Sequence, residues 1–487
     1  MTPCLRTALP LVIAAILLLP VSSTEAQSSR APLTVEQARE DLDVLQRALE
    51  EAHGGYDRFV ERTELARRFA THRARITRPL GQYEFAGLLS EAIAELRDGH
   101  ARLEFDSLTN AALGSALLLP LRVQLEGEHL IVRANDSPTD RSILPGMELL
   151  SINGRSSTDL FAALLPKISP DGFIETGRRH RVGVDFARLH WLYVEQAERY
   201  ELVARQADGS VVRATIPGIT DRERRNVENP VNAAFARNVA RLDGIEERVG
   251  VAFDADGRTA RLRVRAFDGQ AFPSTLDSIF RQLRERGTQH LVLDLRGNGG
   301  GVDEYGALLV SYFTEQPFRY FDHIHVTTVA PSFATWLPRT GDALRAGSVA
   351  DPAGGFRITE QRHSGVGTQQ PSAPGFRGRL TVLIDGGSFS TTADVAAQLR
   401  SRNRAVFIGE ETAGTYEGNT SGLNARIILP NSRLSLRVMM YGYWNAVSAV
   451  PGGRGIVPDH VVPLRVADIL AGRDPAIDMA RRLATAP

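Results

Sequence analysis

The chain has 487 residues, of which 43% are hydrophobic and 23% charged, and its formal net charge is zero. A chain of this length exceeds a single hydrophobic core and predicts about two to four domains. The balanced charge provides neither the basic surface that nucleic acids require nor an acidic solvating tail, so we expect no nucleic-acid partner.

The first residues predict export. Arg6 supplies a short positive region, and the apolar run from Ala8 to Val21 is short for a membrane span. Residues 24–26 then offer small side chains at the positions that a signal peptidase reads. We therefore expect a signal peptide at residues 1–26 and a mature chain in the bacterial periplasm or secreted, with no membrane association after signal removal. The alternative is an uncleaved membrane anchor.

Two residue counts restrict the chemistry. Cys4 is the only cysteine and lies within the predicted signal peptide, so the mature chain is expected to lack disulfides, thiol catalysis and cysteine-ligated zinc. Lys167 is the only lysine, and it lies far in sequence from every glycine-rich segment described below.

Residues 34–97 have the apolar spacing of helices. Thr34 and Gln37 form a capping box before the first helix. The last helix is expected to end at Asp98 and Gly99, because glycine suits the left-handed position after a helix. His100 follows directly and is therefore expected at the exit of a packed helix.

Residues 117–217 change to strand patterns, with alternating segments, a turn at Asn153-Gly154, a hairpin near its end and a short helix at 157–165. Residues 218–247 are rich in Arg, Asn and Glu and predict a surface connection. From about residue 248 the pattern becomes strand–helix–strand, which indicates an α/β core with parallel strands. Residues 323–375 show little periodicity and predict a lid or an active-site loop. The expected strands are 259–267, 290–295, 380–385, 405–409, 425–430 and 434–444, and the expected helices are 276–286, 302–313 and 391–400.

A first candidate site lies where the strand at 380–385 passes through two glycines into a helix. A serine at that point stands at the carboxyl end of a central strand, and the first amides of the helix point toward an anion formed there. The alternative is that Ser388, Ser390, Thr391 and Thr392 only cap the helix, with Asp394 at capping-box spacing from Thr391.

A second candidate is the segment DLRGNGGG at 294–301, with four glycines in five positions. Glycines permit the close backbone approach that an oxyanion-binding amide requires. A nucleotide-binding loop is a weak alternative, because no Gly-Lys-Ser/Thr is present and no ribose-binding acid follows at the right spacing. A plain tight turn is the other alternative.

Three segments in this order, LVLDLRGNGGG, GGSFSTTADVAAQL and VFIGEETAGTYEGNTSG, resemble the C-terminal processing (tail-specific) serine peptidases. The likeness spans about residues 80–470 and is greatest to the branch with the tricorn protease core and retinoid-binding-protein-like modules. It implies an α/β fold with an N-terminal helical bundle, a degenerate PDZ-like β-rich domain and a crotonase/ClpP-like α/β core. The implied domains, after the signal peptide, are 33–107 (helical, carrying His100), 108–217 (PDZ-like), 218–247 (connecting) and 248–470 (catalytic core).

The resemblance also implies roles for individual residues. Ser390 matches the nucleophile, and the amides of Gly299 (with Gly300 as the alternative) and Thr391 match the oxyanion hole. In the lysine-using branch the base would stand at Thr415, so that mechanism is excluded here.

In the tricorn-like branch the base is a histidine before the PDZ-like region, which His100 in LRDGHARL matches. Neutral imidazole is a suitable base for a serine. The alternatives are a surface His100 that merely follows a helix, and His323 and His325, whose spacing also suggests a metal site. Solvated loop residues are the better interpretation of that pair.

One position departs from the family pattern. A serine precedes the histidine in the tricorn-like arrangement and is backed by a distant glutamate, whereas Gly99 precedes His100 here. Glu417 is our candidate for the carboxylate that orients His100. Glu410, Glu411 and Asp98 are alternatives.

These observations predict an exported serine peptidase that acts on a peptide or protein substrate, with Ser390 as nucleophile, His100 as general base, and neither metal nor organic cofactor. The PDZ-like region would bind the peptide or its carboxyl end by strand addition, with the peptide as an extra strand of its sheet. The alternative is a non-catalytic module that binds a peptide or an apolar ligand. An acyl-CoA reaction on a crotonase-like core is disfavoured by export.

Overall fold

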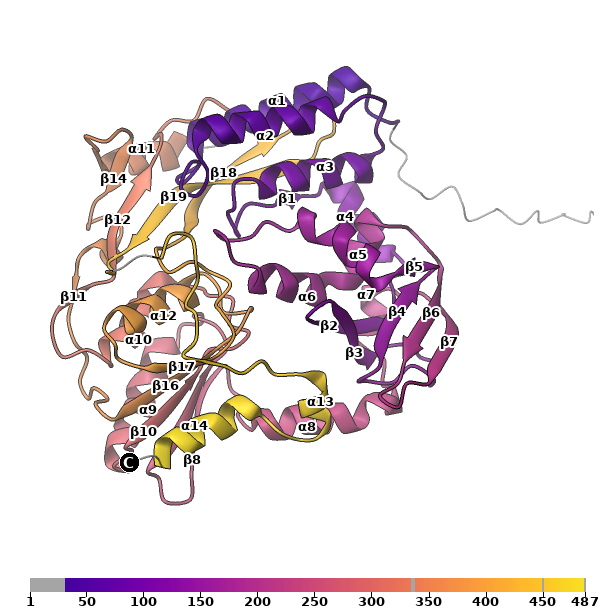
Figure 1. The fold of residues 1–487 in the computed structure, drawn as a ribbon. Helices are drawn as coiled ribbons and strands as arrows, with labels where there is room; N and C mark the ends of the chain where they lie inside the picture. Colours follow the sequence, from indigo (N-terminus) through magenta and orange to yellow (C-terminus); the bar gives the residue numbers. More distant parts are fainter. Residues whose placement is uncertain (1–30, 334–337, 449–450, 486–487) are drawn as a thin grey trace, which may run out of the picture.

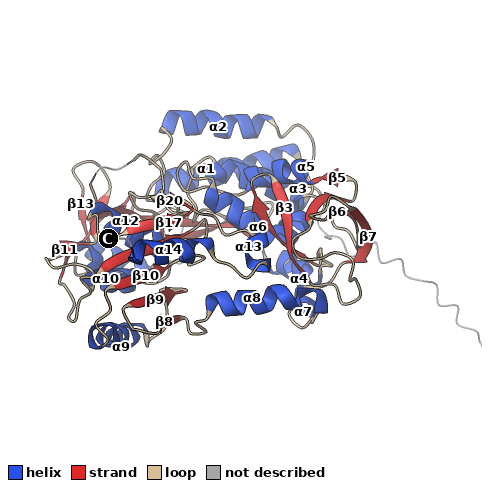
Figure 2. Ribbon diagram, turned by 60° about the horizontal axis from the view of Figure 1, so that its bottom comes forward, coloured by secondary structure: helices blue, strands red, loops and turns tan. Residues whose placement is uncertain are grey.

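The computed structural model describes residues 31–333, 338–448 and 451–485. The predicted signal peptide at 1–26 lies outside the described residues. Among the described helices, none combines the length and apolar character needed to cross a bilayer. The predicted fold class, an α/β chain with N-terminal helices, a PDZ-like β-rich region and an α/β core, is confirmed (Figures 1 and 2).

Three N-terminal helices cover one face of a sheet whose two long strands come from the far end of the chain (Figure 1). The predicted capping box of Thr34 and Gln37 is present. The apolar faces of the helices pack on Ile427, Leu436 and their neighbours in the last two long strands. The helices are α1 (Val35–Ala52), α2 (Arg62–Ala74) and α3 (Gln82–Ala94), and the two strands are β18 (Thr420–Ile428) and β19 (Ser435–Asn445).

The end of α3 differs from the prediction. The helix ends at Ala94, and the left-handed residue after it is Arg97 (φ 57°), not Gly99. Gly99 is required for a steric reason that involves the candidate site and is described below.

The PDZ-like region is an antiparallel sheet of order β2-β3-β4-β6-β7, with β5 paired to β4. The predicted turn is present, because Asn153 and Gly154 both have positive φ. Helix α6 (Thr176–Tyr193) packs on the edge strand β2 (Leu121–Glu126), with Gly183 facing the backbone of that strand. The remaining elements are α4 (Ser107–Ser115), β3 (His129–Asn135), β4 (Glu148–Ile152), β5 (Arg155–Ser156), α5 (Ser157–Leu164), β6 (Arg199–Arg205) and β7 (Val211–Pro217).

The connecting segment contains helices that the sequence did not indicate. Phe235 of its longest helix is buried against Val466 and Ile469 near the C-terminus, which ties the connection to the rest of the molecule. The helices are α7 (Asp221–Arg224), α8 (Ala233–Asp243) and, near the C-terminus, α13 (Val466–Leu470).

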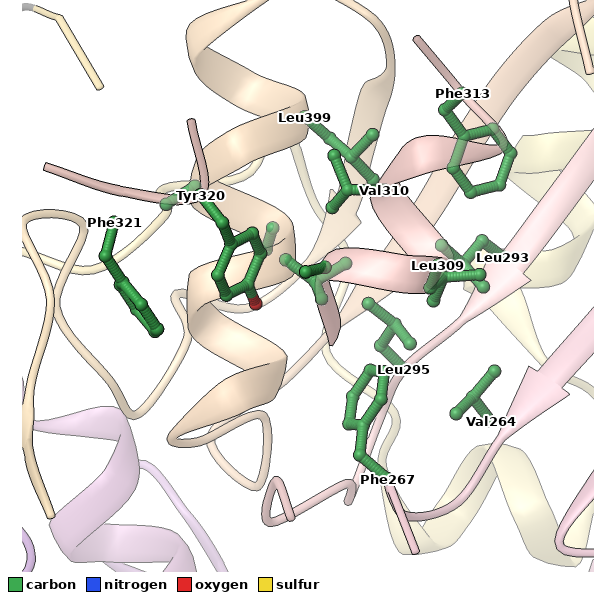
Figure 3. Close-up of a cluster of buried hydrophobic side chains, with 14 of the residues drawn as sticks. Val264, Phe267, Leu293, Leu295, Leu309, Val310, Phe313, Tyr320, Phe321 and Leu399 are labelled. Carbon is green, nitrogen blue, oxygen red and sulfur yellow. The ribbon is translucent and has the colours of Figure 1, made fainter. Parts of the chain in front are cut away.

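The core sheet has the order β20-β17-β16-β10-β9-β8, and all its pairs except β8–β9 are parallel. Its central strands are apolar on both faces because helices cover both, as buried parallel sheets require. Figure 3 shows part of this core, where Leu293 and Leu295 pack beneath Leu309 and Val310. The elements are β8 (Val249–Phe253), β9 (Thr259–Val264), α9 (Phe272–Glu285), β10 (His290–Asp294), α10 (Asp303–Ser311), β16 (Arg379–Ile384), α12 (Thr391–Ser401), β17 (Val406–Gly409), β20 (His460–Val461) and α14 (Pro475–Thr485).

The segment at 323–375 contains short strands and a helix that its weak periodicity did not indicate. Strand β12 (Phe321–Val326) pairs with β19 and stands inside the second sheet, of order β1-β19-β12-β14-β13. Short strands with mixed burial produce no clear period, which explains why the sequence did not indicate them. The remaining elements here are β1 (Leu103–Glu104), β11 (Phe318–Arg319), α11 (Pro338–Ala346), β13 (Ser348–Ala350), β14 (Phe356–Ile358) and β15 (Thr368–Gln369).

A buried carboxylate closes the end of β10. Asp294 is 2% exposed, and its oxygens lie 2.5 Å from Arg263 Nη1 and 2.8 Å from Arg296 Nη2. Burial opposes the ionisation of Asp294, but the charges of the neighbouring arginines outweigh it and lower its pKa.

Replacing Asp294 by alanine should reduce the free energy of unfolding by about 3–5 kcal/mol, because the mostly buried Arg263 loses its counter-charge and Arg296 keeps only Asp474. Asp268→Ala is the matched control, since its ion pair with Arg248 is largely exposed and should contribute less than about 1 kcal/mol. Urea unfolding of both variants measures the difference. Equal losses would contradict the assignment.

Candidate active site

Ser390 stands in a strained turn between β16 and α12. Its backbone has φ 57° and ψ −133°, a combination that a non-glycine residue adopts only where its surroundings enforce it. Ser390 is the N-cap residue of α12, but its hydroxyl makes no capping hydrogen bond. The hydroxyl is therefore available for other chemistry.

Two of the neighbouring hydroxyl residues, Ser388 and Thr391, have structural partners instead. Ser388 is fully buried, and its Oγ donates to the carbonyl of Leu295. Thr391 Oγ1 donates to the carbonyl of Gly301. Asp394 accepts hydrogen bonds from two asparagine side chains, of Asn419 and Asn445, rather than closing a capping box. The alternative of a purely capping cluster therefore does not describe Ser390.

His100 meets Ser390 across 290 residues of sequence. Its Nε2 lies 3.2 Å from Ser390 Oγ. The imidazole ring packs on the ring of Phe389, with their centroids 4.4 Å apart. Burial lowers the pKa of His100 to about 4, and the charges of Arg102 and Arg181 add to this effect. The ring is thus neutral at pH 7 and able to accept a proton.

Asp98 is the carboxylate behind His100. Its Oδ1 lies 3.8 Å from His100 Nδ1 and accepts the backbone N–H of the same residue at 2.8 Å. Its Oδ2 lies 2.6 Å from His53 Nε2 and accepts the hydroxyl of Thr420. Burial opposes the ionisation of Asp98, but His53 and His100 outweigh it and lower its pKa to about 2. An ionised Asp98 favours the His100 tautomer with the proton on Nδ1, which leaves Nε2 free to accept the serine proton.

The other predicted carboxylates have different partners. Glu417 Oε2 accepts the backbone N–H of Gly453, and Glu411 forms an ion pair with Arg454. Glu410 lines the cavity between the PDZ-like region and the core that is described below, and burial raises its pKa. The geometry therefore pairs His100 with Asp98 and not with Glu417, our first candidate.

The glycine loop after β10 lies against the serine turn. A Cβ on Gly300 would lie 2.7 Å from Ser390 Cβ and 3.0 Å from the amide nitrogen of Thr391. The N–H of Gly300 donates to Asn298 Oδ1, whereas a Cβ on Gly299 would meet open space. Thr391 begins α12, and first-turn amides have no intrahelical acceptor. Gly299 is thus better placed than Gly300 to act with Thr391 as an anion donor.

Position 99 requires glycine because the side chain of Phe389 occupies the space where a Cβ would lie. A Cβ on Gly99 would lie 2.8 Å from Phe389 Cε2, on the ring that supports His100. Asp171 holds this loop from the other side, where its carboxylate accepts the amides of Gly99 and Thr415. Burial and the charge of Asp98 raise the pKa of Asp171 to about 7.

Several of these residues had no signal in the sequence. His53 and Asp171 lie in unremarkable segments, and only the fold brings them to the loop that carries His100. Phe389 lies between Ser388 and Ser390 in the sequence. Its contact with His100 could not be predicted, because the contact depends on where the fold places His100.

The two histidines considered as metal ligands lie elsewhere. His323 stacks on Trp444 and its Nδ1 lies 2.7 Å from Asp322, while His325 meets the edge of the same tryptophan. Within the described part of the chain, no three histidine, cysteine or acidic side chains are grouped closely enough to hold a metal ion.

A cavity of about 590 Å³ lies beside the site, between the PDZ-like region and the carboxyl ends of the core strands. Its walls include Val123 and Leu125 of the edge strand β2, and Gly183 of α6. Gly297 and Gly386, from the two loops that carry the candidate residues, complete it on the core side. Crevices at the carboxyl ends of parallel strands are the usual ligand sites of such sheets.

Adding a methyl group at Gly99 should displace Phe389 and with it His100. We expect Gly99→Ala to slow the reaction of Ser390 with a fluorophosphonate by at least about tenfold, because small displacements of reacting groups are costly. Gly114→Ala, where a Cβ meets nothing within 4 Å, is the control. Measurement of labelling rates on folded proteins decides, and an unchanged rate for Gly99→Ala would contradict the steric role.

Comparisons with known proteins show what the core and the fold of this chain are similar to. Residues 258–462 match the model of peptidase family S41. A search of curated protein sequences found no match. The structure is similar to mature CPAF complexed with lactacystin, at 17% identity and a TM-score of 0.63, with 92% of this chain and 98% of that chain covered. A second structure of mature CPAF gives 16% identity and 0.61, covering 92% and 96%.

The photosystem II D1 C-terminal processing protease aligns at 15% identity and a TM-score of 0.43, covering 90% of this chain and 98% of that chain. At these identities the two CPAF structures describe the fold alone. The sequence likeness is to peptidase family S41, and it concerns the core of the chain at residues 258–462.

Proposed function

We propose that this chain is an exported serine peptidase in which Ser390 is the nucleophile and His100 the general base. The observation that carries the proposal is the 3.2 Å distance between Ser390 Oγ and His100 Nε2. The strained backbone of Ser390 supports it, because such strain is concentrated at functional sites. The match of residues 258–462 to the model of peptidase family S41 supports the hydrolysis of peptide bonds.

The reaction follows from these positions. Ser390 Oγ attacks the carbonyl carbon of the scissile bond while His100 Nε2 takes its proton. The amides of Gly299 and Thr391 donate to the oxygen that becomes negative. His100 then gives the proton to the leaving amine, and a water molecule hydrolyses the acyl-enzyme by the same steps.

Asp98, rather than Glu417, is the proposed partner of His100. At 3.8 Å from His100 Nδ1 it acts through its charge and through its hydrogen bond to the backbone, and it stabilises the imidazolium that forms. A lysine base is disfavoured, because Lys167 Nζ is bound to Glu91 at 2.6 Å and Thr415 Oγ1 donates to the carbonyl of Gly418.

The PDZ-like region is proposed to receive the substrate. Strand β2 is the edge strand of its sheet, and an extended peptide binds such an edge through backbone hydrogen bonds. The cavity beside β2 is lined by Gly297 and Gly386, which belong to the same two loops as Gly299 and Ser390. The positive, apolar and small-residue segments at 1–26 support export to the periplasm or beyond.

Labelling with a fluorophosphonate probe tests the dyad directly. The wild type should be labelled, Ser390→Ala should not be, and His100→Ala should be labelled at least about 100-fold more slowly, since general base catalysis contributes about 10²–10⁴-fold. Ser388→Ala is the matched control, because its buried hydroxyl faces Leu295. A folded wild type that is not labelled would favour a non-catalytic binding module on the same scaffold.

The pH dependence of labelling tests the state of His100. Because the folded pKa of about 4 lies below the ordinary value of 6.5, the neutral base persists as the pH falls from 7 to about 5. We expect the labelling rate to fall to half near pH 4. The unfolded chain takes up the proton first, so the stability contributed by neutral His100 is lost between about pH 6.5 and 4.

Circular dichroism at each pH separates that loss of structure from loss of the base. A half-maximal rate near pH 6.5 in folded protein would contradict a buried, neutral base.

A further inference from the structure

A second, smaller pocket lies on the other side of the loop that carries His100. It has a volume of about 150 Å³, enough for one side chain. Ala101 and Arg102, which follow His100 directly, form one wall. A stripe of α6 at helical spacing forms the opposite wall, with Arg181, Asp185, Leu189 and Leu192. We call this the arginine pocket.

The charges in the arginine pocket are not balanced. Arg181 Nη1 lies 3.5 Å from the carbonyl oxygen of Gly99, and its Nε lies 3.9 Å from Asp185, beyond hydrogen-bond distance. Arg102 is exposed and forms no hydrogen bond or ion pair through its side chain within the described ranges. The two guanidinium groups therefore face one acidic side chain, Asp185, whose contact with Arg181 is loose.

The third cation of the pocket is already neutralised. Lys167 Nζ donates to Glu91 at 2.6 Å and to the carbonyl of Ala163 at 3.0 Å. The remaining walls are apolar, with Ile93, Leu103 and Ile168 beside the leucines of α6. An aliphatic stem that ends in a carboxylate matches this combination, because the stem meets apolar walls and the carboxylate meets two guanidinium groups.

The position of the pocket relates it to the proposed reaction. The general base of a serine peptidase protonates the leaving amine, so its side of the site faces the residues that follow the scissile bond. Arg102 and Arg181 both lie near enough to His100 to act on it electrostatically. A substrate group in the arginine pocket thus belongs to the C-terminal side of the cleavage point.

We propose that the arginine pocket binds an acidic side chain of the substrate on the C-terminal side of the scissile bond. This inference rests on the proposed peptidase function of the same site. It adds a substrate preference that Ser390, His100 and the oxyanion amides do not provide, since those groups contact only the reacting peptide.

Cleavage of a random peptide library, analysed by mass spectrometry, measures this preference. The wild type should cleave about tenfold more often before a position with Glu or Asp than before the same position with Gln or Asn, as expected for a charge-assisted hydrogen bond. Libraries with free and amidated C-termini separate an acidic side chain from the carboxylate of the chain terminus. Preference in both libraries supports the side chain, and preference confined to free termini overturns the proposal.

Four variants make the test specific. Arg102→Gln and Arg181→Gln should each reduce the preference to about threefold or less, and Arg102→Lys should retain most of it. Arg188→Gln is the matched control, because this arginine lies on the same helix outside the pocket and pairs with Asp221. Arg181 also touches the loop of His100, so a loss seen only in kcat, without a change of preference, would assign it a structural role and overturn its part in binding.

A binding experiment keeps this inference separate from the proposed function. The Ser390→Ala protein is titrated with fluorescent peptides from the same library that carry Glu or Gln. If the wild type hydrolyses nothing but Ser390→Ala binds the Glu peptides about tenfold more tightly, the peptidase proposal fails and the carboxylate site stands. Equal binding of Glu and Gln peptides, together with cleavage that ignores charge, overturns the arginine pocket as a carboxylate site.

Discussion

The carboxylate of Asp98 joins three parts of the chain at one buried point. It accepts His53 from the N-terminal helices, Thr420 from the last sheet, and the backbone N–H of His100. A buried charge is tolerated only where hydrogen bonds replace the lost water. The same bonds that make this charge tolerable therefore fix the loop of His100 relative to the sheet, and the position of His100 beside Ser390 depends on them.

Close backbone packing is the second condition of the site. Gly99 leaves room for Phe389, Gly300 for Ser390, and a Cβ on Gly387 would lie 2.9 Å from His180 Nε2. Three segments from different parts of the sequence thus meet with no space between them for even a methyl group. Only Gly300 of these three glycines has a positive φ. The glycines are therefore needed for close packing as much as for backbone conformational freedom.

The sequence was most informative where one residue type has few alternatives. The buried strands β10 and β16 were recognisable from their apolar runs, and Ser390 and His100 were predicted from motifs that place a hydroxyl and an imidazole in turns beside a helix. The carboxylate partner was not recognisable, because Glu417, Glu410, Glu411 and Asp98 are equivalent in sequence and only tertiary contacts separate them. Gly99 was misread for a related reason: a glycine after a helix suggests a left-handed turn, while its true requirement comes from Phe389, 290 residues later.

The sharing of β19 between the N-terminal helices and the rest of the molecule has a consequence for the order of synthesis. Strand β1, three residues after His100, pairs with β19 through Leu103 and Leu436, and α1–α3 bury their apolar faces on the same strand. Because synthesis starts at the N-terminus, the proposed base His100 is made early. Its loop cannot reach its final position until strand β19, which ends at residue 445, has been made. Ser390 and His100 remain apart throughout that interval, so an incomplete chain contains both residues but cannot bring them together for catalysis.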